Sequence, residues 1–243
     1  MGSRNNFGLH AIIEIKEAKT VENEKNLLES LIEAFDLNVV RKEKLEKGYA
    51  CVIAESHLHL RIDEENSRKY IADIYTCSEN FDEGKVEEGI AKLRKKGYSC
   101  GVIEQFRRIK PEDVRIKETP WGLHIDINLG SEVGRKVRDY IKETYQKGER
   151  KRIITHEFHH PMCKKGESDT RIIIDESGNY IIFIHPWPEE DYVSVDIYSK
   201  KKEEIKRDIE SRVGLERIWN EFRQIEEIIE GMNDDYAIRG PVA

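Results

Sequence analysis

An internal repeat is the feature that most constrains how this chain can fold. Residues 8–15 read GLHAIIEI, and residues 122–129, starting 114 positions later, read GLHIDINL. Each copy is an apolar run of strand length with a histidine near its start, and a stretch with helical spacing of apolar residues follows it, at 21–35 and 133–145. The order of a strand followed by a helix therefore occurs twice.

The later part of each copy adds a hairpin, a further strand and a helix. The segments YIADIYTC (70–77) and YVSVDIYSK (192–200) share the letters DIY at Asp73 and Asp196. Before each lies a predicted hairpin, which in the second copy has turn residues at 176–179. Charged amphipathic helices are predicted at 84–96 and from 201 to about 232.

The sequence of each half thus predicts roughly four antiparallel strands with helices on one face of the sheet. Two such layers bury most apolar surface by packing their sheets against each other. The predicted fold is α+β, an αββα sandwich in which two repeats form a pseudo-dimer. We divide it into an N-terminal repeat at 1–110 and a C-terminal repeat at 111–243, joined by the charged stretch 107–121 with its two prolines.

Charge and composition narrow the class of ligand. The net charge is -7, from 41 Lys and Arg against 48 Asp and Glu, which disfavours nucleic acid and favours a small-molecule substrate. No apolar run approaches the roughly 18–20 residues of a membrane helix, and the first residues lack a signal-peptide pattern, so we expect a cytoplasmic protein without a membrane partner.

The four cysteines are too sparse and too irregularly spaced for a disulfide framework or a metal knuckle. The segment HEFHH (156–160) matches a zinc-protease motif, but that motif works only on a helix. Here a strand-like segment precedes it and Pro161 follows, which would place the outer histidines about 13 Å apart. We therefore expect no metal site.

The stretch ACVIAESHLHLRI, residues 50–62, begins as a buried strand and then sets Glu55, Ser56 and His57 in a row. Together with ADIYTC further on, and with FIHPWPEEDYVSVDIYS in the second half, it resembles the S-adenosylmethionine decarboxylases. These are pyruvoyl enzymes of polyamine synthesis. The resemblance covers nearly the whole chain and is strongest at 50–77 and 180–199. Within the family, the chain is similar to the members in which two repeats are fused in one chain and one active site is kept.

The resemblance implies a self-cleaving bond between Glu55 and Ser56. The Ser56 hydroxyl would attack the Glu55 carbonyl, the amide would become an ester, and elimination followed by hydrolysis would leave a pyruvoyl group. That ketone is the expected cofactor, an electron sink for decarboxylation. The implied base for processing is His185, helped by a hydroxyl of Thr170 or Ser168.

Further roles follow from the same resemblance. Cys77 matches the proton donor, with a buried strand thiol as the alternative reading. The residues expected to bind substrate are two aromatic rings that stack on adenine and three carboxylates, of which Glu189 binds the ribose: Phe7, Phe158, Glu14, Glu17 and Glu189. For Glu14 and Glu17, an exposed charged edge is an equal alternative.

The two copies have kept different residues of this set, and neither is complete alone: the first lacks the histidine, and the second lacks the serine and the cysteine. A displacement of 124 sets Arg61 opposite His185 and Tyr180 opposite Ser56, and Lys200 stands where Cys77 would be. One pyruvoyl group per chain is therefore expected, in a monomer or homodimer.

Three functions remain open at this level. The first is decarboxylation of S-adenosylmethionine. The second is decarboxylation of arginine or ornithine on the same scaffold. The third is an inactive paralogue that activates a partner decarboxylase, which Arg61 and the absent helper serine would favour.

Overall fold

The structure is a computed structural model. It describes residues 8–16, 24–53, 56–62, 69–76, 81–120, 122–147, 150–159, 167–187 and 191–213. Within these residues lie two six-stranded sheets and four helices.

The first half forms one sheet and two helices. The strands are β1 (Leu9–Lys16), β2 (Val39–Leu45), β3 (Gly48–Ile53), β4 (Ser56–Ile62), β5 (Lys69–Thr76) and β6 (Ser99–Arg107); the helices are α1 (Glu24–Ala34) and α2 (Glu83–Lys95). The second half contains β7 (Val114–Thr119), β8 (Gly122–Asn128), β9 (Lys151–His159), β10 (Glu167–Asp175), β11 (Tyr180–Trp187) and β12 (Tyr192–Ser199), with α3 (Glu132–Tyr145) and α4 (Lys202–Val213).

The two sheets have the same strand order. The first runs β2-β3-β4-β5-β1-β6 and the second, read from β9, runs β9-β10-β11-β12-β8-β7. All pairs are antiparallel. The edge strand next to β1 or β8 comes from a different place in each half: β6 follows α2 at the end of the first half, whereas β7 precedes β8 at the start of the second. This strand order confirms the repeat as the organising unit of the fold.

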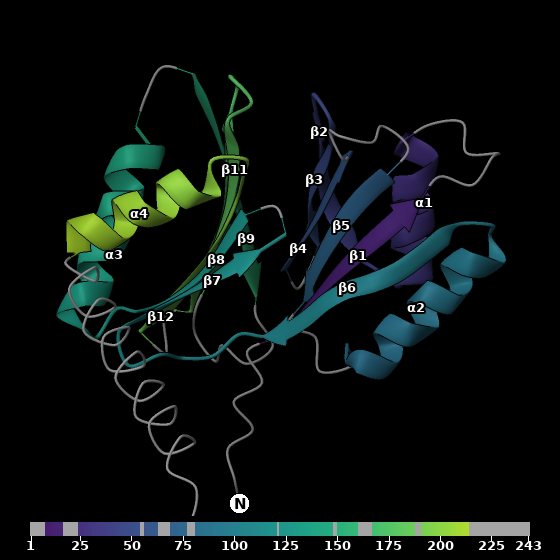
Figure 1. Cartoon of the computed structure of the whole chain (residues 1–243), viewed down its shortest axis with the longest axis horizontal. Coiled ribbons are helices and arrows are strands. Elements are labelled where there is room, and N and C mark those ends of the chain that lie inside the picture. The colour runs from purple at the N-terminus through teal and green to yellow at the C-terminus, as the bar shows by residue number, and fades with distance from the viewer. Residues whose placement is uncertain are drawn as a thin grey trace, which may run out of the picture.

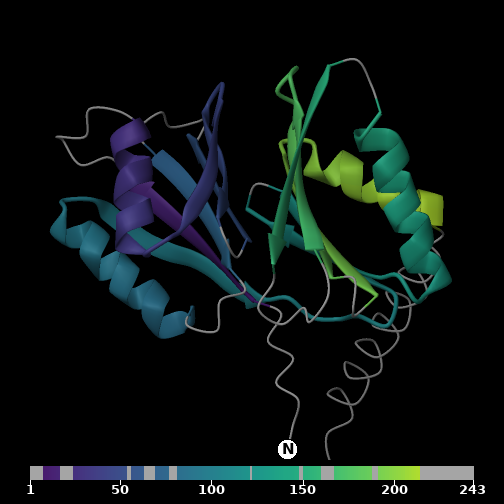
Figure 2. The same ribbon diagram turned by 180° about the vertical axis from the view of Figure 1, so that it is seen from behind.

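The sheets face each other and the helices cover their outer sides. Figure 1 shows α1 and α2 on the outside of the first sheet and α3 and α4 on the outside of the second, and Figure 2 shows the same layers from behind. The predicted α+β class and αββα sandwich are confirmed. The division into domains at residue 110 stays a prediction.

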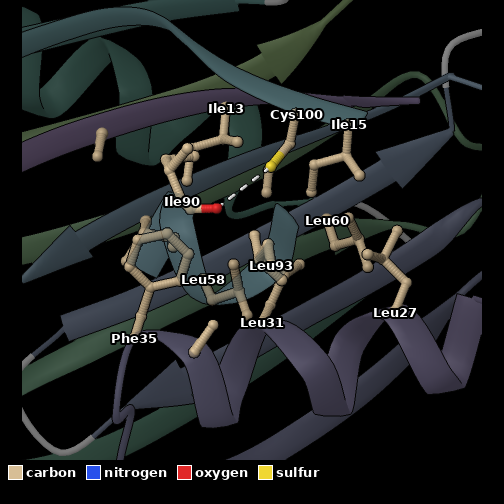
Figure 3. Packing of buried hydrophobic residues seen from close by; sticks show 14 of the residues in the cluster. Ile13, Ile15, Leu27, Leu31, Phe35, Leu58, Leu60, Ile90, Leu93 and Cys100 are labelled. Carbon is tan, nitrogen blue, oxygen red and sulfur yellow. Dashed lines mark hydrogen bonds between the residues drawn. The ribbon is translucent and has the colours of Figure 1, made fainter. Parts of the chain in front are cut away.

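Strand alternation sorts the side chains into layers. On β1 and β4 the residues Ile13, Ile15, Leu58 and Leu60 point toward the helices, where they pack with α1 and α2 (Figure 3). An equivalent cluster lies between α3, α4 and the second sheet. A third apolar cluster, which includes Ile12 and Phe183, lies between the two sheets. Alternate residues on the same faces of these strands, such as His10 and His185, also point between the sheets, and many of them are polar.

The structure corrects several details of the sequence analysis. Each sheet has six strands rather than about four. The charged segments 39–45 and 99–107 add β2 and β6 to the first sheet, and 114–119 and the strand-like segment 151–159 add β7 and β9 to the second. The stretch read as a linker, 107–121, therefore contains a strand. The described ends of the helices differ from the predicted ends by one residue at most, while residues 21–23 lie outside the described set. The last predicted helix continues in α4 only to Val213 among the described residues.

Other sequence inferences can be compared directly with the described residues. Residues 176–179 form the expected turn, with Gly178 at φ 76 in the left-handed region that favours glycine. The HEFHH segment lies on β9, a strand as expected, up to His159. Cys51 and Cys100 are buried free thiols, while Cys77 and Cys163 lie outside the described residues. None of the helices described is long and apolar enough to cross a lipid bilayer.

Candidate active site

Polar side chains from both sheets meet in the buried layer between them. They come from alternate positions on β1, β4, β5, β8, β11 and β12, with Arg108 from the chain after β6: His10, His57, His59, Asp73, Arg108, His124, Asp126, His185, Asp196 and Tyr198. Each is buried, the least so at 5% exposure. Buried polar groups require partners, and here the partners lie largely across the sandwich.

Asp196 is the centre of this network. Its carboxylate accepts hydrogen bonds from Arg108 Nη2 (2.9 Å) and His124 Nδ1 (2.6 Å). Burial alone would raise the pKa of Asp196, but His10, His124 and Arg108 hold it well below its usual range. Asp196 is therefore a buried anion between buried cations. Arg108 also lies over the Tyr75 ring of the first sheet, 3.4 Å from its centroid, and so links the two halves.

His124 is held between two carboxylates. Its Nδ1 contacts Asp196, and its Nε2 contacts Asp126 Oδ1 at 2.9 Å. Burial opposes the charged imidazole, but Asp196 and Asp126 raise the pKa of His124 to about 9. Both ring nitrogens therefore donate hydrogen bonds at neutral pH. Tyr192 donates its hydroxyl hydrogen to the same Asp126 oxygen.

A second chain of hydrogen bonds leads to His185. The Tyr198 hydroxyl donates to Asp73 Oδ2 (2.5 Å) and lies 3.0 Å from His57 Nε2, so His57 Nε2 carries a hydrogen and donates it to the Tyr198 oxygen. His57 Nδ1 is then an acceptor, and it lies 2.6 Å from His185 Nε2. His185 Nε2 must donate, which leaves the lone pair of His185 on Nδ1.

Burial keeps both of these imidazoles neutral. The pKa of His57 is well below 6.5, first because of burial and then because of His185. The pKa of His185 is also well below 6.5, first because of burial and then because of Arg108. The 3.8 Å approach of His57 Nε2 to Asp196 is consequently not an ion pair. The buried layer thus holds a charged imidazole at His124 and a neutral pair at His57 and His185.

The structure brings His185 next to the hairpin that carries Ser56. His185 lies on β11, 3% exposed, and contacts His57, the neighbour of Ser56 on β4. Ser56 pairs with Ile53 of β3 and Thr76 of β5. The side chain of Ser56 and the whole of Glu55 and Cys77 lie outside the described residues, as do Phe7, Glu17 and Glu189.

The helper residues are placed by their backbone. Thr170 precedes Arg171, which pairs with Ile184, so it lies beside the His185 end of β11. Ser168 pairs with Phe158 of β9, two residues farther along β10. The side chains of these three residues lie outside the described set.

Glu14 is not brought to Ser56. It pairs with Ile71 of β5, whereas Ser56 pairs with Thr76, five residues or about 17 Å along that strand. Glu14 forms ion pairs with Lys69 (2.7 Å) and Lys16 (3.3 Å), and the hydrogen bond from Lys69 lowers the pKa of Glu14. Its surroundings match the charged-edge reading.

Two residue sets have the donor atoms that zinc prefers. His10, His124 and Asp196 place ligand atoms within 4.8 Å of one another, and so do His57, His185 and Asp196. Arg108 already donates to Asp196, and His124 uses both nitrogens as hydrogen-bond donors. A metal ion would have to displace these hydrogens beside a guanidinium, so the donor chemistry favours a hydrogen-bonded network over a metal centre.

Most of this network has no role that the sequence reveals. His10, His124, Asp73 and Asp196 stand out in the sequence only as matching letters of the repeat, and Arg108 lies in the predicted linker. A usable signal was present, because these polar residues stand at alternate positions on strands whose other residues are apolar.

No protein-family model and no curated protein sequence matches the chain. Among solved structures, the chain is similar to the adenosylmethionine decarboxylase from Aquifex aeolicus VF5, with 22% identity and a TM-score of 0.29. The alignment covers 44% of this chain and 95% of that one. A sequence identity and a TM-score this low assign no function to the chain. The function is therefore inferred from the residues of the site.

Replacing Arg108 tests whether the network holds the two sheets together. We expect Arg108→Ala to lower the free energy of unfolding by about 3–5 kcal/mol, because it leaves the buried Asp196 without its guanidinium partner. The neighbouring Arg107→Ala is the matched control. Arg107 pairs with Glu83 at the surface and should cost about 0–1 kcal/mol. Urea unfolding measures both, and equal effects would contradict the role of Arg108.

The charge of His124 predicts a stability change at alkaline pH. A pKa raised from 6.5 to about 9 stabilises the folded state fully below pH 6.5, and this contribution disappears as the pH rises through about 9. Such a change corresponds to about 3 kcal/mol. Nitrogen-15 NMR of the imidazoles should show both His124 nitrogens protonated at pH 8, with His124→Gln assigning the signals. Titration of His124 near 6.5 would contradict the arrangement.

Proposed function

We propose that this protein is a pyruvoyl-dependent decarboxylase that cleaves its own chain between Glu55 and Ser56, with S-adenosylmethionine as substrate. The residues around Ser56 and His185 that resemble the decarboxylases motivate the proposal. The observation that carries it is the 2.6 Å contact between His57 Nδ1 and His185 Nε2. Through this contact, the imidazole of His185 in the second half meets His57, the second residue of β4.

The backbone around Ser56 suits self-cleavage. β3 ends at Ile53, β4 begins at Ser56, and the two residues pair, so the chain reverses direction within two residues. A tight reversal restricts the backbone and can hold a hydroxyl against the preceding carbonyl. The sequence places Ser56 at the end of that reversal, directly after the carbonyl of Glu55.

His185 has the protonation state that a base requires. Its pKa lies well below 6.5, mainly because of burial, so the ring is neutral at physiological pH. The hydrogen-bond chain from Asp73 through Tyr198 and His57 leaves its lone pair on Nδ1. In the proposed processing reaction, His185 removes the proton that starts elimination from the ester of Ser56. Tyr198 and His57 are positioning residues that fix its tautomer.

The group formed from Ser56 would supply the ketone that accepts electrons during decarboxylation. The proposed formation of this group is supported by the position of Ser56 at the start of β4, next in sequence to His57, which contacts the neutral His185. We assign Cys77 as the acid that returns a proton to the product, because a thiol with a reference pKa near 8.5 stays mostly protonated at neutral pH. Glu189, Phe7 and Phe158 are the proposed contacts to ribose and adenine, and Thr170 or Ser168 is the proposed helper hydroxyl.

Self-cleavage tests the two-half site. We expect Ser56→Ala to remain one full-length chain, because it lacks the attacking hydroxyl, and His185→Ala to stop or slow cleavage strongly. Tyr198→Phe keeps the ring but removes the hydroxyl that orients His57, and should slow cleavage by about 10-fold or more. Denaturing gels over time after synthesis measure the fraction cleaved. Normal cleavage of His185→Ala would rule out the proposed role of this residue.

Carboxyl-labelled substrates test the choice of substrate. The purified protein is offered S-adenosylmethionine, arginine and ornithine in parallel, with Ser56→Ala as the inactive control. We expect labelled CO₂ from S-adenosylmethionine alone, because the sequence offers a ribose-type carboxylate and aromatic residues suited to adenine. Release from arginine or ornithine alone would replace the substrate but keep the reaction. Absence of release from a cleaved chain would contradict the enzyme assignment.

A further inference from the structure

A groove on the outer side of the second sheet is only partly covered by helices. It lies between α3 and the strands β8, β10, β11 and β12, with a volume of about 450 Å³. Because neighbouring residues of a strand point to opposite faces, this is the face of the sheet turned away from His185 and Asp196. The apolar residues of the lining come from β8, the turn after it, α3, β11 and β12: Ile127, Leu129, Ile141, Ile184, Val193 and Val195.

The first half of the chain covers the equivalent surface. Leu60 of β4 is the counterpart of Ile184 at the displacement of 124. Leu60 is 0% exposed and packs with the helices of its own half (Figure 3), whereas Ile184 is half-buried and lines the groove. On the same outer face, Ile153 of β9 pairs with Ile173 and is 47% exposed. Helices α3 and α4 therefore leave open a part of the second sheet whose counterpart is closed in the first.

Helix α4 packs on the other side of α3. Arg138, Lys142 and Gln146 follow one another at intervals of four residues, so they form one side of α3, and all three line the groove. Tyr140 lies two residues, or about 200°, around the helix from Arg138. Its hydroxyl donates a hydrogen bond to Asp208 of α4 at 3.0 Å. The described part of α4 therefore does not cover the groove.

The sequence after α4 has the pattern of an amphipathic helix. Residues 215–230 lie outside the described residues and read LERIWNEFRQIEEIIE, between Gly214 and Gly231. Glycine is common directly after a helix, so Gly214 favours a change of direction after Val213. Apolar residues then recur at helical spacing and predict one apolar face: Leu215, Ile218, Trp219, Phe222, Ile225 and Ile229.

The length of this segment suits the groove. As a helix it would be about 24 Å long, while the four strands below the groove span roughly 15 Å. Helix α4 ends at Val213, five residues or about 8 Å beyond the contact of Asp208 with α3. Because α3 is about 10–12 Å across, a segment of that length starting at the end of α4 can cross α3 and reach the groove.

The charges of the groove and the segment are compatible. At the rim of the groove Arg138 pairs with Asp139, and Lys142 and Arg171 add two further cations. The segment carries five Glu against two Arg. Ion pairs at such a rim contribute only about 0–1 kcal/mol each, so the apolar contact is the main argument.

We infer that the apolar face of residues 215–230 packs into this groove within the same chain. Short isolated helices are marginal in water, and an apolar face is stabilised by burial against an apolar surface. The groove offers that surface next to the end of α4. The strands of its floor carry His185 and Asp196 on their other face, so the packed segment closes the sheet behind the candidate active site.

This inference goes beyond the proposed enzyme activity and does not depend on it, because it rests on the lining of the groove and on the sequence of the segment. Cleavage between Glu55 and Ser56 would leave the groove and the segment in one fragment. The packing can therefore be measured whether or not the chain is cleaved.

Amide hydrogen exchange of the full chain, measured by mass spectrometry on peptides that cover 215–230, tests the packing. We expect these amides to exchange at least about 10-fold more slowly than in an unstructured peptide of the same sequence, because a helix without tertiary contacts opens readily. Ile184→Glu places a carboxylate in the apolar groove and should remove most of this protection. The matched control is Ile153→Glu, on the same face but outside the groove lining, which should retain it.

Methyl NMR gives the reciprocal test and applies even if Ile184→Glu fails to fold. Phe222→Ser/Ile225→Ser changes only the apolar face of the segment, and should shift the Ile184 methyl resonances because it removes an aromatic ring from the groove. Asn220→Ser/Gln224→Ser changes the opposite face of the segment and should leave those resonances in place.

Several results would overturn the inference. They are exchange of 215–230 at the unstructured rate, equal effects of Ile184→Glu and Ile153→Glu, and unchanged Ile184 methyl resonances in Phe222→Ser/Ile225→Ser. Protection that disappears on dilution would also overturn it, because the groove would then be filled by a second copy of the chain. Self-cleavage is followed on the same samples. Protection in a chain that never cleaves would reject the proposed enzyme alone, and cleavage without protection would reject the packing alone.

Discussion

A carboxylate buried between two sheets is the interaction on which the rest of this structure depends. Asp196 is 3% exposed and accepts hydrogen bonds from Arg108 and His124. An uncompensated charge in this layer would cost several kcal/mol, so the sheets must pack where Arg108 can reach Asp196 and lie over Tyr75. The geometry of the buried layer follows from this requirement, because apolar contacts alone would tolerate many relative positions of the sheets.

The same layer determines what His185 can do. Because the Tyr198 hydroxyl donates to Asp73, its oxygen accepts the hydrogen of His57 Nε2, and His57 Nδ1 then accepts from His185 Nε2. This chain of hydrogen bonds specifies the tautomers of both His57 and His185. Burial keeps His57 and His185 neutral, while Asp196 and Asp126 keep His124 charged in the same buried layer. Two kinds of imidazole therefore coexist because their neighbours differ, and the neutral one lies beside the hairpin of Ser56.

Much of the fold could be predicted from the sequence, since apolar periodicity and the repeat specify strands, helices and their layering. The charged edge strands β2, β6 and β7 escaped prediction because their residues alternate weakly between buried and exposed positions. The network around Asp196 also escaped, because its contacts join residues 88 and 72 positions apart. Sequence patterns report which face a residue takes, and only the packing of two sheets reveals its partner.

The two ends of the buried layer show how a repeat can diverge. One end keeps a serine hairpin and a neutral imidazole, and the other carries Tyr180, Arg61 and Lys200 in the wall of one pocket. The measurement that tests the central claim most directly is the denaturing intact mass of the purified, unaltered protein. The account predicts two fragments, 1–55 and 56–243, with the second lacking one ammonia relative to an N-terminal serine. A single full-length chain that never cleaves would contradict it.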